Sequence, residues 1–119
     1  MILTPQDVLA ELSHSEKTVT FEQCIAMIDA HYHYTPTQFS NGLSATRVIN
    51  EAGKNAGSCK IFAFAQLMGL DQASTLACFG QFYQDVLDTP DAVDHQNIRN
   101  FMHDGWAGIQ FEGVALVAK

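Results

Sequence analysis

The chain has 119 residues, of which 47% are hydrophobic and 16% are charged, and its formal net charge at pH 7 is -7. This composition predicts one compact domain over residues 1–119, because a chain of this length buries roughly two thirds of its surface without disulfides or a metal. The negative charge argues against a nucleic-acid or anionic-membrane surface, since both need clustered lysine and arginine. No run reaches the about 18 apolar residues of a membrane span, so the cytoplasm is expected.

Three cysteines, Cys24, Cys59 and Cys78, are widely spaced and form no C-x-x-C pair. An odd number of cysteines at such spacing indicates reduced thiols, and neither a disulfide framework nor a zinc ribbon.

The first two predicted helices have clear start signals. Thr4 is placed to cap a helix over residues 5–12, with proline at the first helical position. Thr20 and Gln23 form a capping box that predicts a second helix over residues 21–32.

The segment from residue 34 to residue 50 has no helical period. Within it, Asn41-Gly42 is the strongest short hairpin signal of the chain, and β-branched residues follow it. We expect two short strands flanking this dipeptide.

A third helix is expected to begin at Asn55 or Ser58 and to end at Gly69, a typical C′ residue. The stretch Gly53–Leu67 joins a loop with two glycines to a segment that is apolar all round. Such a helix has no solvent face, so it is predicted to be buried.

Asp71 predicts the cap of a fourth helix that continues to Pro90. Its expected buried face consists of Leu76, Phe79, Tyr83, Val86 and Leu87.

Asp94 predicts the cap of a fifth helix, with Val93 stapled against Ile98, and this helix ends at Asp104-Gly105. The segment 106–117 alternates around Glu112-Gly113 and predicts a hairpin of two closing strands. Together these elements predict an α+β domain of about five helices packed on a small, mostly antiparallel sheet.

Two further sets of residues receive structural interpretations. The acidic run lacks the order of an EF-hand, so a solvated surface is expected and no metal site: Asp85, Asp88, Asp91 and Asp94. The aromatic residues lack an accompanying basic stripe, so they are expected in the core and not as a stacking platform: Phe62, Phe64, Phe79, Phe82, Tyr83 and Trp106.

Several long and unusual strings carry a family resemblance: residues 50–65, Cys78-Phe79-Gly80, residues 94–102 and Gly105-Trp106-Ala107-Gly108. Together they resemble the HopJ type III effector family of bacterial proteins over nearly the whole chain. The resemblance implies one HopJ-like domain and a host protein as partner if the chain is injected by type III secretion, but no established enzymatic activity. A capped helix from residue 4 differs from a flexible, serine-rich export leader, and favours a protein that stays in its own cytoplasm.

The loop and the start of the third helix form the first candidate site. Glycine-flanked amides at a helix start bind phosphate or carboxylate, and two lysines could supply counter-charge. The expected ligand is a small anion or an acidic group of a protein partner, and the spacing does not match a Walker motif or another cofactor motif. The predicted ligand-binding residues are Gly53, Lys54, Asn55, Gly57, Ser58 and Lys60.

The second candidate site is that of a thiol hydrolase or transferase. If Ser58 caps the third helix, Cys59 lies at its first position, where the helix dipole favours a thiolate. His95 or His103 would be the base, and Asp94 beside His95 would orient the ring. The alternative interpretation gives Cys59 a packing role and Asp94 a capping role.

Overall fold

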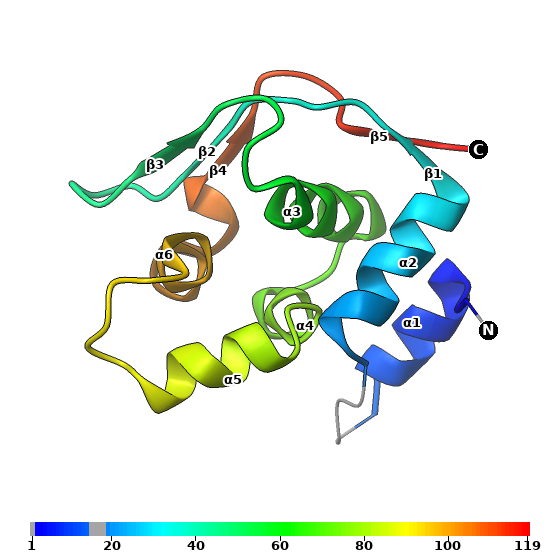
Figure 1. Ribbon diagram of the computed structural model, residues 1–119, viewed down its shortest axis with the longest axis horizontal. Coiled ribbons are helices and arrows are strands. Elements are labelled where there is room, and N and C mark those ends of the chain that lie inside the picture. The colour runs from blue at the N-terminus through cyan, green and yellow to red at the C-terminus, as the bar shows by residue number, and fades with distance from the viewer. Residues whose placement is uncertain (1, 15–18) are drawn as a thin grey trace.

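The structure is a computed structural model that describes residues 2–14 and 19–119, and it confirms the α+β class (Figure 1). The helices are α1 (Pro5–Leu12), α2 (Phe21–His31), α3 (Ala56–Met68), α4 (Gln72–Ala77), α5 (Gln81–Asp88) and α6 (Gln96–Asp104), followed by the 3-10 turn η1 (Gly105–Gly108). The strands are β1 (Tyr32–Tyr34), β2 (Phe39–Asn41), β3 (Val48–Asn50), β4 (Ile109–Phe111) and β5 (Leu116–Ala118). Within these described ranges, no helix is long and apolar enough to cross a membrane.

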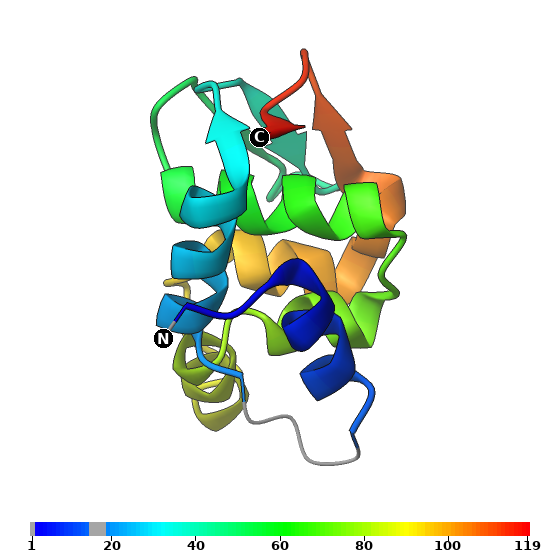
Figure 2. The same ribbon diagram turned by 90° about the vertical axis from the view of Figure 1, so that its right-hand side faces the viewer.

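Helix α3 occupies the centre of the molecule. Figure 2 shows it crossing between the strands on one side and the other helices on the opposite side. Six of its side chains are buried: Cys59, Ile61, Phe62, Ala63, Phe64 and Ala65. The Phe62 ring lies 5.0 Å from that of Phe101 and 5.3 Å from that of Phe79, which places it at the centre of the aromatic core. The prediction of a buried helix is confirmed.

Helices α1 and α2 begin as the sequence predicts. The Thr4 side chain accepts from the Asp7 amide at 3.1 Å, and Asp7 accepts from the Thr4 amide. Thr20 and Gln23 form the same reciprocal pair at the start of α2. These capping boxes satisfy amides that a helix start leaves without partners.

The strands form two antiparallel sheets, ordered β3-β2-β4 and β1-β5. The predicted hairpin at Asn41 is confirmed, but its turn spans residues 42–47, with Asn41 itself in the strand opposite Val48. The closing hairpin is wrong, because β4 pairs with β2 and β5 pairs with β1. Trp106 lies in η1, before β4 begins.

The predicted fourth helix is two helices, α4 and α5, and Gly80 lies between them. Gly80 has φ 55° and ψ -123°, a conformation that is essentially limited to glycine. An added Cβ would lie 2.8 Å from the backbone nitrogen of Phe21, so α2 approaches the chain closely at this point. Leu87, predicted on the buried face, is 43% exposed, whereas Val86 beside it is buried as predicted.

Candidate functional site

A cavity of about 400 Å³ lies where α3 and α6 begin. Its polar side consists of residues from these two helix starts: Asn55, Gly57, Ser58, His95, Gln96 and Asn97. Its apolar side consists of Phe21, Val48, Phe79, Phe82 and Ile98. Two segments some forty residues apart in the sequence are therefore joined at one cavity.

Neither helix start at the cavity has a side-chain cap. Asn55 precedes α3 and His95 precedes α6, both with φ 52° in the left-handed region, and neither side chain accepts from the first turn. By contrast, the side chains of Thr4, Thr20 and Asp71 cap α1, α2 and α4. First-turn amides point out of a helix start, so those of α3 and α6 lack the usual capping acceptor beside the cavity.

A network of buried asparagines, joined by the exposed Asn55, connects the two helix starts. Asn50 and Asn97 exchange two amide hydrogen bonds of 3.0 and 2.9 Å, which join β3 to the first turn of α6. Asn55 donates to the Asn50 oxygen at 2.7 Å, and Asn41 donates to the Asn97 carbonyl at 2.8 Å. The network therefore fixes both starts relative to β2 and β3, and it uses one of the two donor hydrogens of the Asn55 side chain.

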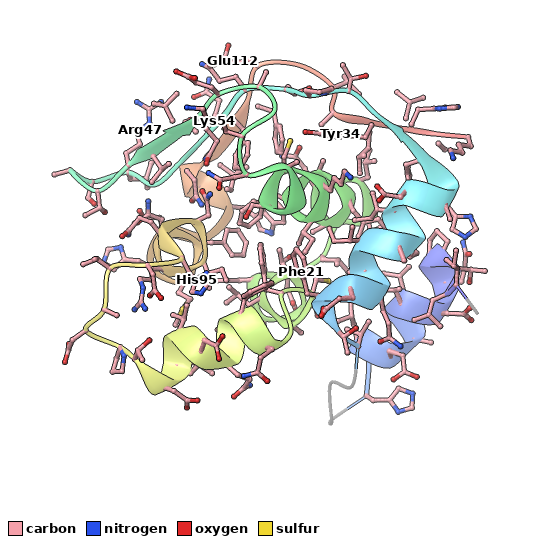
Figure 3. All side chains as sticks on the ribbon, viewed as in Figure 1. Phe21, Tyr34, Arg47, Lys54, His95 and Glu112 are labelled. Carbon is pink, nitrogen blue, oxygen red and sulfur yellow. The ribbon has the colours of Figure 1, made fainter. Side chains whose placement is uncertain are left out.

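Aromatic rings close the apolar side of the cavity. A Cβ on Gly57 would lie 2.8 Å from Cζ of Phe21, so this ring packs directly on the first turn of α3. The Phe82 ring lies 5.0 Å from that of Phe21 and 5.4 Å from the His95 imidazole. Figure 3 shows Phe21 and His95 on the side of α3 that faces α5.

The two lysines of the predicted anion site lie elsewhere. Lys60 forms a 2.8 Å ion pair with Asp29 of α2, and its ammonium lies 4.9 Å from the centre of the Tyr34 ring. Lys54 is exposed and lies 3.7 Å from Glu51. Figure 3 shows Lys54 and Tyr34 on the strand side of α3, opposite His95.

Of the six predicted ligand-binding residues, three line the cavity and three do not. Asn55, Gly57 and Ser58 line it, whereas Gly53, Lys54 and Lys60 are absent from its lining.

Cys59 lies deeper in α3 than the sequence suggested. The helix begins at Ala56 and not after Ser58, so the Cys59 amide already bonds to the Asn55 carbonyl at 3.0 Å. The residue is 1% exposed, and its thiol donates to the Thr37 carbonyl at 3.7 Å. Burial raises the pKa of this thiol despite the nearby charge of Lys60.

The other predicted catalytic residues lie along α6. His95, and not Asp94, is the N-cap. Asp94 instead bonds to Arg99 at 2.8 Å, which lowers the pKa of its carboxyl, and its other oxygen lies 3.8 Å from Nε2 of His95. His103 is exposed near the end of the helix, with Nδ1 2.7 Å from Asp104.

Of the predicted catalytic residues, only His95 lines the cavity. Asp94 lies beside His95 but is absent from the lining, as are Cys59 and His103. The predicted staple at the start of α6 is also wrong, because Val93 is 84% exposed.

Seven residues of the cavity lining were not predicted as site residues: Phe21, Val48, Phe79, Phe82, Gln96, Asn97 and Ile98. One signal was present for Asn97, which precedes Phe101 by four residues and so shares the buried face of α6. A polar residue on such a face needs a buried partner. The partner, Asn50, is 47 residues away, and no local pattern identifies it.

The chain was compared with protein families and with known proteins. The family model described as HopJ type III effector protein matches residues 5–116. A crystal structure of the unknown-function protein VPA0580 is similar at 51% identity and a TM-score of 0.91, covering 100% of this chain and 97% of that one. No curated protein matches the chain. The chain therefore belongs to the HopJ type III effector family.

Proposed function

We propose that the protein binds a small anionic ligand in the cavity at the starts of α3 and α6. The observation that carries this proposal is that two helix starts without side-chain caps meet at one cavity. Each start has a partial positive charge of roughly half a unit, and its first amides are donors for phosphate or carboxylate oxygens.

The lining of the cavity supports the same ligand charge. It contains no aspartate or glutamate among the described residues, although the chain as a whole has a net charge of -7. Ser58 and His95 add side-chain donors beside the amides. An anion would therefore contact donors and no carboxylate of the lining itself, although the Asp94 carboxylate lies 3.8 Å from Nε2 of His95, outside the lining. The net negative charge of the chain disfavours anions in general.

We infer that this binding takes place in a cytoplasm. Cys24, Cys59 and Cys78 are free and buried, which is typical of proteins kept in a reducing compartment. The cytoplasm of a host cell is equally reducing, so injection by type III secretion is compatible with the same site and with a host ligand or partner. Secretion of a reporter fused to residues 1–20 would distinguish the two settings.

The direct test is titration of the isotope-labelled protein with inorganic phosphate, sulfate and acetate, followed by amide NMR. We expect the amide signals of Gly57, Ser58, Gln96 and Asn97 to shift together and to saturate in the millimolar range. If these signals stay unchanged while others drift with ionic strength, the proposal is wrong.

A pair of glycine variants makes the test specific. Gly57→Ala places a methyl group against Phe21 at the cavity wall, so we expect it to weaken anion binding. Gly113→Ala is the matched control, because its Cβ would meet only the Thr37 methyl at 3.7 Å. Equal anion affinity in both variants would contradict the placement of the site.

A further inference from the structure

The apolar half of the cavity contains more aromatic surface than a simple anion can use. Phe82 is 39% exposed, although the sequence predicts it in the core. Its ring meets Phe21 edge-on at an interplanar angle of 85° and lies tilted at 48° to His95. Three rings from α2, α5 and the start of α6 thus surround one side of the space.

The volume of the cavity points in the same direction. About 400 Å³ lies within the range of sites for organic ligands, which is roughly 300–1,000 Å³. A phosphate or acetate ion would fill a small part of it and would leave the aromatic wall in water. Burial of that wall needs a ligand with an apolar body.

We propose that the ligand is an aromatic acid, a planar ring bonded to a carboxylate or phosphate group. The ring lies against Phe82, Phe21 and His95, where edge and face contacts between rings are favourable. The acid group lies at the first turns of α3 and α6. This assignment rests on the proposed anion site and adds the chemical class of its ligand.

The orientation follows from the position of Phe21. Its ring touches the backbone of Gly57, so the aromatic wall and the first-turn amides of α3 are adjacent. His95 joins the two halves from the other helix, because it is both the N-cap of α6 and a neighbour of the Phe82 ring. A ligand with its acid group attached closely to its ring matches this arrangement.

Calorimetric titration with matched probes tests the proposal. The probes are 2-naphthoate and 2-naphthyl phosphate, which are compared with acetate and inorganic phosphate respectively, the acid group of each probe alone. An uncharged ring, 2-naphthylmethanol, completes the set. We expect at least one aromatic acid to bind about tenfold or more tightly than its acid group alone and than 2-naphthylmethanol. Whether naphthoate or naphthyl phosphate shows this gain distinguishes aryl carboxylates from aryl phosphates as the ligand.

Two neighbouring aromatic residues of α5 provide the variants. Phe82→Leu should weaken binding of the aromatic acid by roughly two- to tenfold and leave acetate or phosphate affinity unchanged. Tyr83→Leu, on the same helix but outside this cavity, should retain the wild-type affinity. Thermal melting of both variants confirms that each is folded.

The outcomes separate the two proposals. If acetate and phosphate bind at the two helix starts but neither aromatic acid binds more tightly, the ligand class is wrong and the anion site stands. If 2-naphthylmethanol binds as tightly as 2-naphthoate, the acid group has no role and the assignment is overturned. If no probe shifts the amides of α3 and α6, both proposals fail.

Discussion

At the scale of single residues, Cys59 has a buried sulfur whose surroundings favour the protonated thiol. It is 1% exposed, and burial raises its pKa. A catalytic cysteine needs the opposite environment, a partly exposed thiolate beside positive charge. Its position at the fourth residue of α3 also removes the helix-start amide that would have stabilised the anion.

We therefore expect iodoacetamide to alkylate Cys59 near pH 6 no faster than the buried Cys24 and Cys78. Mass spectrometry of the native protein over time measures the three rates, and the same reaction in denaturant provides the control in which all three react. Rapid and selective labelling of native Cys59 would instead support the alternative, a thiol hydrolase or transferase.

At the scale of elements, two helix boundaries depend on glycines with positive φ, a region that other residues enter at an energetic cost. Gly69 ends α3 with φ 66° and ψ 32°, and an added Cβ would meet nothing within 4 Å. Gly80 separates α4 from α5 with φ 55° and ψ -123°, and an added Cβ would lie 2.8 Å from the Phe21 nitrogen. The two glycines share positive φ but differ in the space around them.

This difference predicts unequal costs of substitution. Gly69→Ala should lower the free energy of unfolding by about 1 kcal/mol, the cost of a left-handed residue. Gly80→Ala should lower it by about 2 kcal/mol or more, because strain and a backbone clash add. Urea denaturation measures both, and a smaller loss for Gly80→Ala than for Gly69→Ala would contradict the role given to this break.

The same elements show what local sequence can predict. The starts of α1 and α2 follow from Thr4 and Thr20 because a capping box lies within four residues. The pairing of β4 with β2 and of β5 with β1 is not local, so the turn signal at Glu112-Gly113 wrongly suggested a hairpin.

The candidate site was also predictable only where it is local in the sequence. The residues Asn55, Gly57 and Ser58 follow from the loop, whereas α6 reaches them through contacts such as that between Asn50 and Asn97. The two lysines wrongly suggested counter-charges for an anion. Lys60 instead pairs with Asp29, and Lys54 lies beside Glu51.

At the scale of the whole molecule, three carboxylates link folding to pH. The pKa values of Asp7, Asp94 and Asp104 are lowered by hydrogen bonds, chiefly from Thr4, Arg99 and His103 respectively. Asp104 also accepts from the Leu43 amide at 2.8 Å, so it connects the end of α6 to the turn between β2 and β3. Each group therefore stabilises the fold while it is ionised.

The sign of the pH dependence follows from the direction of these shifts. An unfolded aspartate has a pKa of about 3.9, so the stabilisation is fully present above that value. As the pH falls below about 4, the unfolded chain takes up protons first, and the free energy of unfolding decreases until the folded carboxylates are also protonated. Urea denaturation between pH 6 and pH 2 should show that the free energy of unfolding falls only below about pH 4.

Asp104→Asn isolates one of the three contributions. The asparagine oxygen can still accept from the Leu43 amide, but no charge remains beside His103. We expect the variant to be less stable than the wild type at pH 6 and to lose less stability on acidification, so that the two curves converge near pH 2. Asp91→Asn is the control, because it removes one negative charge from the exposed loop before α6 and leaves the contact between Asp104 and His103 intact. Its free energy of unfolding should depend on pH as that of the wild type does. If the free energies of unfolding of the wild type and Asp104→Asn change in parallel with pH, the Asp104 carboxylate does not contribute to the pH dependence of stability.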